Sequence, residues 1–220
     1  MKKFNLAIDG PAGAGKSTIA KRIARELGFI YVDTGAMYRA MALYFIRNRI
    51  AADETEKIEE ACRSVNVTIE YRDGEQLVLL NGENVNGLIR TEEVGNMASA
   101  TSVNKAVRLK LVELQQNLAE KESVVMDGRD IGTYVLPNAD LKIYLTAGSR
   151  ERAGRRWAEL KEKGVPADID SIERDIIERD QRDMTREFAP LKQAEDAVYL
   201  DTSDMTIDEV VEKITGMIHQ

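Results

Sequence analysis

The sequence predicts an α/β fold, in which a parallel sheet of about five strands is flanked by helices and carries a small antiparallel insertion. Short apolar runs alternate with amphipathic helical stretches along most of the chain. The first apolar run leads directly into a glycine-rich loop and a helix. One segment, near residues 63–90, instead alternates apolar and polar residues between turn signals. The first two observations are typical of βα units, and the third is typical of a β-meander.

The elements are predicted in chain order from these patterns. Residues 4–8 form a compact apolar run, as expected for a buried parallel strand. In the helix that follows, Ile19, Ile23 and Leu27 recur at helical spacing, and Gly28 suits its C-terminal cap. Residues 29–33 resume strand character. The remaining predicted strands are 123–126, 141–145 and 197–200, and the remaining predicted helices are 37–47, 105–121, 149–163, 172–179 and 207–218.

The inserted segment is predicted from alternation and turn chemistry. Apolar residues alternate from residue 65 to 71, a turn is expected at Asp73-Gly74, and apolar residues return at 77–80. A second turn signal, Asn81-Gly82, follows. Such dipeptides between alternating runs are strong hairpin signals, so we expect a small antiparallel meander inside the α/β core.

Composition limits the function classes. A chain of 220 residues that is 43% hydrophobic and 31% charged can bury a sizeable core. Its apolar runs are too short for a membrane span or a signal-peptide core, and we expect a cytoplasmic protein. The formal net charge of −7 argues against sequence-independent nucleic-acid binding. A lone Cys62 and a lone His219 leave no disulfide, no cysteine cluster and no expected Ser-His or Cys-His catalysis.

The glycine-rich loop is the strongest motif. Residues 10–17 fit the pattern G-x-x-x-x-G-K-[ST] between a predicted strand and a predicted helix. Glycines let backbone N–H groups turn onto phosphate oxygens, and the helix N-terminus adds a positive dipole end. Lys16 would reach the β- and γ-phosphates of a nucleoside triphosphate. The expected phosphate-binding residues are Gly10, Pro11, Ala12, Gly13, Ala14, Gly15, Lys16, Ser17 and Thr18.

A magnesium site is expected beside this loop. The Ser17 hydroxyl completes a Mg²⁺ shell in loops of this kind. Asp127 ends a predicted buried strand, where a second contact to the ion, through water, would arise. Asp127 could also cap the following turn, and the two roles are compatible.

Other motifs narrow the class to a small kinase. A GTPase of this type needs a guanine-reading N-K-x-D, which the sequence lacks, and motor ATPases are larger or more basic. Acceptor candidates lie in "DTGAMYR", which contains Tyr38 and Arg39, and in "DGRD", which contains Arg129 and Asp130. Each arginine alone would suit a surface ion pair. Together, however, the two motifs follow the ends of predicted strands in an open α/β sheet, which is where ligands bind in such folds.

Eight arginines between Arg150 and Arg186, interleaved with acids, allow two interpretations. They could form a helical surface laced with salt bridges, or a positive lining for a polyanionic small molecule. Composition does not decide between them.

Four stretches together resemble the bacterial cytidylate (CMP) kinase family: "DGPAGAGKST", "YVDTGAMYRA", "MDGRDIGTYVLP" and "ERDQRDMTREFAPLKQAEDAVYLDTS". The resemblance covers residues 5 to about 215 and includes the inserted hairpin. It implies a nucleoside monophosphate kinase fold with a five-stranded parallel core, an enlarged NMP-binding region and an arginine-rich lid. The implied reaction is ATP plus CMP or dCMP giving ADP plus CDP or dCDP.

The resemblance also implies residue roles. Thr34, Arg108 and Asp130 match positions that read cytosine, and Arg39 and Arg129 match contacts to the acceptor phosphate. Ser99, Arg179 and Asp183 match positions that contact the sugar. The assignment of Ser99 depends on its spacing from Arg108. Thr34 stands where some members have serine, and Met184 stands where some have arginine. The expected CMP-binding residues are Thr34, Tyr38, Arg39, Ser99, Arg108, Arg129, Asp130, Arg179, Asp183 and Arg186. The expected catalytic residues are Lys16, Arg129, Arg179 and Arg186, and the lid segment also holds Arg152, Arg156 and Arg182.

The implied organisation is one kinase domain with three regions: a core (1–36, 100–150 and 190–220), an NMP-binding region (37–99) and a lid (151–189). We expect Arg179 and Arg186 to be exposed lid residues, and the chain to be a monomer. Two alternatives stay open: a small kinase for another acceptor such as UMP or AMP, and a nucleotide-binding switch without catalysis. The second would require loss of Lys16 or of the lid arginines, and both are present.

Overall fold

The computed structural model describes residues 3–72 and 75–218, and the chain forms two compact units. The first unit contains the chain up to Tyr31 and from Glu122 onward, and the second is Val32–Lys121. The turn predicted at Asp73-Gly74 and the lone His219 lie outside the described residues. The three-region division into core, NMP-binding region and lid stays a prediction.

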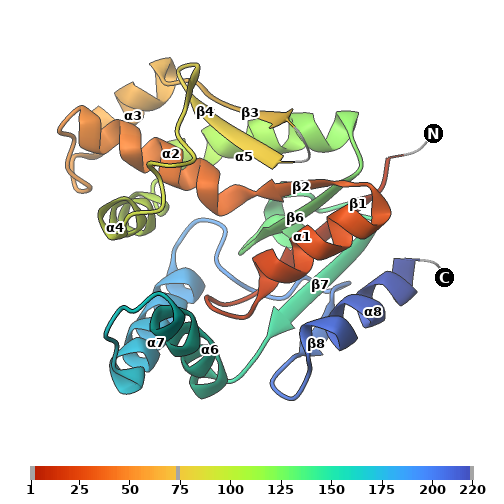
Figure 1. Cartoon of the computed structure of the whole chain (residues 1–220). Helices are drawn as coiled ribbons and strands as arrows, with labels where there is room; N and C mark the ends of the chain where they lie inside the picture. Colours follow the sequence, from red (N-terminus) through yellow and green to blue (C-terminus); the bar gives the residue numbers. More distant parts are fainter. Residues whose placement is uncertain (1–2, 73–74, 219–220) are drawn as a thin grey trace. The chain divides into compact units, whose positions relative to one another are not determined.

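Five strands form one sheet in the order β2-β6-β1-β7-β8, which confirms the predicted parallel sheet (Figure 1). The strands are β1 (Asn5–Asp9), β2 (Ile30–Asp33), β6 (Val124–Gly128), β7 (Leu141–Thr146) and β8 (Val198–Asp201). Central β1 pairs in parallel with β6 and β7, and β7 pairs in parallel with β8. Because parallel strands point the same way, the carboxyl ends of β1 and β6 lie side by side, with Asp9 opposite Gly128.

Two helices cover one face of this sheet. In α1 (Lys16–Leu27), Ile19 and Ile23 are buried, and Gly28 at a φ of 67° ends the helix as predicted. α8 (Ile207–Ile218) packs against α1. Their apolar faces form one hydrophobic cluster with Ile8 of β1 and Leu145 of β7, so the strand that precedes the glycine-rich loop is firmly embedded.

The rest of the first unit includes two helices that pack on each other, α6 (Ser149–Glu162) and α7 (Ile169–Thr185), and one π-helical turn, η1 (Ile131–Val135). α7 begins before the predicted start at residue 172, because the Asp168 side chain accepts the Ser171 N–H and caps the helix there. It also continues past the predicted end at residue 179.

In its described residues, 32–72 and 75–121, the second unit contains four helices and a small sheet. α2 (Thr34–Arg47) packs on α4 (Glu92–Thr101) and α5 (Lys105–Lys121), and α3 (Thr55–Ser64) packs on α5. The sequence patterns predict α5 and most of α2, whereas α3 and α4 were not predicted. α3 buries only Ile58, Ala61 and Cys62, and α4 only Val94, Ala98 and Thr101, so their apolar stripes are narrow and easily overlooked.

The inserted meander is confirmed as a three-stranded sheet of β3 (Val67–Arg72), β4 (Glu75–Leu80) and β5 (Glu83–Asn84) in that order. β3 and β4 are antiparallel, with Val67 opposite Leu80 and Ile69 opposite Val78. At the β4–β5 turn, Asn81 and Gly82 have φ values of 50° and 86°. Positive φ at both residues explains why Asn-Gly stands there.

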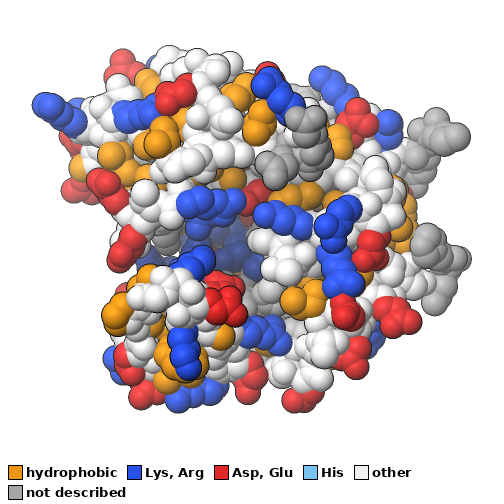
Figure 2. All heavy atoms as spheres, in the orientation of Figure 1, with side chains coloured by type: hydrophobic (Ala, Val, Ile, Leu, Met, Phe, Trp, Pro, Cys, Tyr) orange, Lys and Arg blue, Asp and Glu red, His pale blue; other side chains and the backbone are white. Residues whose placement is uncertain are grey.

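The visible surface mixes both signs of charge with scattered hydrophobic side chains, including over α6 and α7 (Figure 2). Within residues 3–72 and 75–218, no helix has the length and apolar character needed to span a membrane.

Candidate functional site

The glycine-rich loop joins β1 to α1 in the first unit, with backbone conformations that require glycine. Gly13 and Gly15 have φ values of 75° and 85°. Gly10 has a φ of 151°, and a side chain there would overlap the Leu145 carbonyl oxygen. The loop can therefore approach its neighbours closely and turn its amides, as the sequence motif predicted.

Lys16 is buried within this loop, with 5% of its surface exposed. Its Nζ donates to the Pro11 carbonyl oxygen at 2.7 Å. Burial, followed by the positive charge of Arg129, holds the pKa of Lys16 well below its ordinary value, although Asp127 and Asp9 oppose the shift. A poorly solvated ammonium of this kind gains strongly from a phosphate anion.

Ser17 and Asp127, predicted from separate motifs, lie in contact. The Ser17 hydroxyl donates to Asp127 Oδ2 at 2.7 Å, and the Tyr31 hydroxyl donates to Asp127 Oδ1 at 2.8 Å. Asp127 stands near the end of β6, next to the loop that follows β1. The tyrosine was not among the predicted site residues, since a lone Tyr within an apolar run gives no signal of its own.

An ion pair between α6 and α7 binds the backbone of the glycine-rich loop at Ala12. The Ala12 N–H donates to Asp180 Oδ1 at 3.1 Å, and Arg152 Nη1 donates to the Ala12 carbonyl oxygen at 2.8 Å. Arg152 and Asp180 also pair directly, at 2.6 Å. Arg152 was predicted in the lid segment, but no role was predicted for Asp180, because no sequence pattern relates residue 180 to residue 12.

Acceptor candidates of the first unit gather around Asp183. Arg129 Nε donates to Asp183 Oδ2 at 2.8 Å, and Arg186 lies 4.0 Å from Asp183 Oδ1. Burial alone would raise the pKa of Asp183, but the charges of Arg129, Arg179 and Arg186 outweigh it and the pKa is lowered. Arg186 Nη2 also lies 3.4 Å from Asp130 Oδ1. The fold thus brings together residues from the "DGRD" run and from α7.

The two lid arginines differ in burial, which corrects one expectation. Arg179 is exposed on α7, as expected. Arg186 is not, because only 5% of its side chain is exposed and its Nε donates to the Ala189 carbonyl oxygen at 2.7 Å. It follows the C-terminus of α7, where the chain turns inward.

The arginine-rich segment forms salt bridges at the surface and in the interior, and a positive lining for a polyanionic small molecule stays a prediction. Arg150 pairs with Asp170 and Glu173, and Arg156 pairs with Glu159, all at the surface. Arg152 and Arg186 are buried and face the phosphate loop and Asp130 instead. Exposed pairs of the first kind contribute little to stability.

The second unit carries Thr34, Tyr38 and Arg39 on the first turns of α2. Asp33 caps this helix by accepting the Ala36 N–H at 2.9 Å, and its other oxygen pairs with Arg90 at 2.5 Å. Thr34 is buried, and the other two are half-buried. The helix start that presents them is therefore fixed by a charged cap.

Arg108 of α5 is buried against the same helix. Only 1% of its surface is exposed, its Nη1 donates to the Ser102 carbonyl oxygen at 3.0 Å, and its guanidinium lies 5.4 Å from the Tyr38 ring centroid. Ser99 lies on α4, and its carbonyl oxygen accepts the Ser102 hydroxyl at 3.0 Å. Within the second unit, Arg108 and Tyr38 thus lie close together, and their role in acceptor binding stays a prediction.

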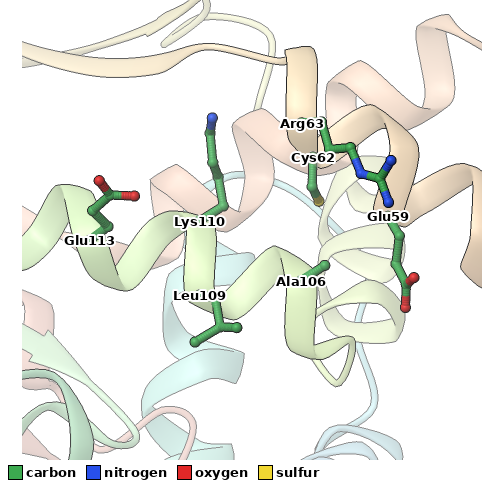
Figure 3. Close-up of a pocket in the computed structure, with 7 residues that line it drawn as sticks. All are labelled: Glu59, Cys62, Arg63, Ala106, Leu109, Lys110 and Glu113. Atoms are coloured by element: carbon green, nitrogen blue, oxygen red, sulfur yellow. The ribbon is translucent and has the colours of Figure 1, made fainter.

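A shallow hollow of about 360 Å³ lies elsewhere in the second unit, between α3 and α5 (Figure 3). Charged Arg63 and Lys110 and apolar Leu109 line it, beside Cys62. Burial raises the pKa of the Cys62 thiol to about 11, so it is not a nucleophile at neutral pH. None of the predicted site residues lines this hollow.

Comparison with known proteins gives a family match. The model of the cytidylate kinase family matches residues 6–220. A protein named cytidylate kinase from Caldicellulosiruptor bescii is 52% identical over 220 residues, covering 100% of this chain and 97% of the relative. One from Geobacillus sp. strain WCH70 is 46% identical over 217 residues, covering 99% and 97%.

Solved structures of lower identity share the fold. An uncharacterized protein from Eubacterium ventriosum has a TM-score of 0.56 at 11% identity, covering 99% of both chains. Shikimate kinase from Bacteroides thetaiotaomicron has a TM-score of 0.50 at 16% identity, also covering 99% of both chains.

Proposed function

The chain belongs to the cytidylate kinase family, and from this premise we propose that it transfers the γ-phosphoryl group of ATP to CMP or dCMP. A phosphate oxygen of the acceptor forms a bond to the γ-phosphorus, and the bond from that phosphorus to the oxygen of the leaving ADP breaks. The products are ADP and CDP or dCDP. The reaction needs ATP as donor and places the chain among the nucleoside monophosphate kinases.

This chemistry requires no general base. The second pKa of a phosphate monoester is about 6, so the acceptor is mostly a dianion at neutral pH and attacks without losing a proton. The protein's task is to bring two anions into line and to neutralise the charge that builds between them. Arginine suits this task, because its planar, always charged guanidinium binds phosphate oxygens in pairs.

The observation that carries the proposal is the concentration of positive charge in the first unit. The charges of Arg129 and Arg179 act on buried Lys16, and those of Arg129, Arg179 and Arg186 act on Asp183. A lysine in a phosphate loop and three arginines within electrostatic reach of each other suit a donor phosphate and an acceptor phosphate together. We assign Lys16 to the γ-phosphoryl group and the three arginines to the phosphates of donor and acceptor.

The acceptor base and sugar are assigned by the family resemblance. Thr34, Arg108 and Asp130 are proposed to read cytosine, Arg39 to contact the acceptor phosphate, and Ser99, Arg179 and Asp183 to contact the sugar. Buried Asp130 supports its assignment chemically, since a carboxylate accepts the cytosine amino group but repels the uracil O4. The buried cation of Arg108 beside Tyr38 supports a rigid, polar acceptor site.

Magnesium is proposed as the cofactor, with Ser17 and Asp127 as the residues that hold it. The donor set fits this ion, because the Ser17 hydroxyl and the Asp127 carboxylate lie 2.7 Å apart and Mg²⁺ prefers oxygen ligands while keeping several waters. When bound, the ion would neutralise charge on the β- and γ-phosphates of ATP.

An acceptor panel tests the proposed function. CMP, dCMP, UMP and AMP are each incubated with the protein, ATP and Mg²⁺, and ADP formation is followed in a coupled assay. We expect CMP or dCMP to give the highest kcat/KM. Preference for UMP or AMP would assign the chain to a different acceptor, and ATP turnover that needs a partner protein instead of an acceptor would make it a switch.

We further propose that the chain acts as a cytoplasmic monomer and binds neither membranes nor nucleic acid. The net charge of −7 supports the part of this proposal that concerns nucleic acid. Light scattering across a range of protein concentrations tests the monomer. A mass of twice 24.6 kDa would contradict it.

A further inference from the structure

Asp9 is a buried carboxylate that the proposed mechanism does not use. It is the last residue of β1, directly before the phosphate loop, and only 5% of its surface is exposed. Its backbone pairs with Gly128 on one side and with Tyr144 on the other, in the middle of the sheet. The main chain of Asp9 is therefore held by neighbouring strands on both sides.

Both carboxylate oxygens of Asp9 bind backbone amides of the π-helical turn η1. The Ile131 N–H donates to Oδ1 at 2.8 Å, and the Gly132 N–H donates to Oδ2 at 2.7 Å. Consecutive amides at the start of a helical turn lack partners within that turn, so the fork of a carboxylate satisfies both. η1 is thus tied to the central strand by a side chain.

Two residues lie between these attachments: Arg129 and Asp130. The Asp9 main chain holds Gly128 on one side of them, and the Asp9 carboxylate holds Ile131 and Gly132 on the other. Arg129 and Asp130 thus form a two-residue span that one residue of β1 fixes at both ends. We assign both residues to binding of the acceptor, Arg129 to a phosphate and Asp130 to the cytosine base.

We propose that Asp9 is a positioning residue for the acceptor: its carboxylate sets the orientation of Arg129 and Asp130 and so determines both the affinity for CMP and the preference for cytosine. The inference rests on the proposed function and adds to it a residue that touches neither substrate. It also gives the π-helical turn a role, as the support of the acceptor-reading span.

The charges around Asp9 support a positioning role over an ion-pair role. The pKa of Asp9 is raised to about 6, because desolvation by burial, with a smaller contribution from the charge of Asp130, outweighs the lowering by the two amides and Lys16. Lys142 also lies close, since a Cβ on Gly132 would be 3.1 Å from its Cδ and 3.4 Å from Asp9 Oδ2. Lys142 Nζ is directed elsewhere, to Pro137 and Asp196. The strongest stabilising contacts of the carboxylate are therefore the two amides.

Asp9→Asn tests the inference, because the amide keeps the shape but directs an NH₂ group at one of the two N–H donors. We expect kcat/KM for CMP to fall by about 10²-fold, the scale of a small misplacement of reacting groups, while the KM for ATP stays within about twofold. The ratio of kcat/KM for CMP to that for UMP should fall as well. If Asp9 had a purely structural role, the variant would affect the kinetics with CMP and with ATP alike, and the ratio of kcat/KM for CMP to that for UMP would not change.

Gly132→Ala disturbs the same contact from the other side while leaving the carboxylate intact. The added methyl group would crowd Asp9 Oδ2 and Lys142, so we expect the same separation of CMP from ATP. Asp140→Asn is the matched control: Asp140 Oδ2 accepts the Asn5 N–H at 2.9 Å at the opposite end of β1. That variant should change neither KM by more than about twofold.

The outcomes separate the inference from the proposed function. A wild-type protein that does not phosphorylate CMP would refute the proposed function, whatever the variants do. If the wild type is active, equal changes in the KM for ATP and for CMP, or no change, in folded Asp9→Asn and Gly132→Ala would overturn the inference. Failure of both variants to fold would overturn it too, because Asp9 would then be a requirement of the fold.

Discussion

At the residue scale, the site combines charges that differ sharply in exposure. Lys16, Asp130 and the side chain of Arg186 are buried, whereas Arg179 is exposed on α7. A buried charge costs stability unless partners or a ligand compensate it, and an exposed charge costs almost nothing. Single substitutions should therefore separate residues that serve only the reaction from residues that serve the fold as well.

Lys16→Met should abolish transfer without weakening the fold. The methionine fills similar space, and removal of a poorly solvated charge leaves the free energy of unfolding unchanged or higher. We expect kcat to fall by about 10²-fold or more, as for loss of one preorganised donor. Steady-state kinetics and thermal unfolding measure the two effects. The control is Lys21→Met on the exposed face of α1, and a folded Lys16→Met with near-normal kcat would remove Lys16 from the mechanism.

Arg179→Ala and Arg186→Ala should both lower kcat strongly, but only the second should lower stability. Arg186 is buried and bonds the Ala189 carbonyl oxygen, so its loss should cost on the order of 1–3 kcal/mol. Chemical denaturation and steady-state kinetics give the two numbers for each variant. Arg174→Ala, exposed on the same helix, is the control and should retain activity. An active Arg179→Ala would show that Arg179 is a surface residue only.

Asp130→Ala should narrow the preference for CMP over UMP. If the carboxylate accepts the cytosine amino group, its removal lowers kcat/KM for CMP far more than for UMP, because only uracil gains from losing the repulsion. Kinetics with both acceptors decide the matter. The contact with Arg186 offers the competing role of orienting that arginine, and a proportional loss for both acceptors would support it.

At the scale of elements, the meander supports the start of α2. Gln76 of β4 accepts the Asp33 N–H through Oε1 at 2.8 Å, and Asp33 caps the helix that carries Thr34, Tyr38 and Arg39. The insertion thus touches the helix start directly, inside the second unit. An added hairpin can in this way influence acceptor binding without contributing a ligand of its own.

Gln76→Ala should therefore raise the KM for CMP and leave the KM for ATP unchanged. Loss of one hydrogen bond of about 0.5–1.5 kcal/mol corresponds to about a two- to tenfold weaker affinity. Glu83→Gln is the control, since it removes only the surface ion pair of β5 with Arg47 at the other end of α2. Equal effects of Gln76→Ala on both substrates would mean that the meander does not act through the acceptor side.

At the scale of the whole molecule, a central strand that ends in a buried carboxylate makes stability depend on pH. The pKa of Asp9 is about 6 in the fold against 3.8 as its ordinary value, so between these values the folded chain binds more protons than the unfolded chain. The stabilising contribution of protonated Asp9 to the free energy of unfolding is fully present below about pH 4 and is lost as the pH rises through about 6. The neutral-pH fold thus carries a cost at Asp9, which is consistent with a positioning role.

Denaturant unfolding of the wild type and of Asp9→Asn between pH 4 and pH 7 measures this cost. The asparagine does not titrate, so the wild type should lose about 2–3 kcal/mol relative to the variant as the pH rises through this window. A difference that stays constant with pH would show that Asp9 does not titrate there.

The sequence by itself determined the parallel α/β sheet, the phosphate loop, the inserted meander and the candidate residues within motifs such as "DGRD". These features depend on short-range patterns: apolar runs, helical spacing, and glycines whose φ values no other residue favours. The narrow apolar stripes of α3 and α4 gave too weak a periodic signal to be predicted.

Only the tertiary structure decided how distant residues meet. Asp180 binds Ala12, Asp9 holds Ile131 and Gly132, and Arg186 turns inward to Asp130 although its sequence context suggested an exposed lid. Hydrogen bonds and ion pairs between residues more than 50 positions apart depend on where the sheet places the chain, and no local pattern encodes them. The physical reason is that burial and pairing are properties of the packed chain, whereas periodicity and turn chemistry are properties of its segments.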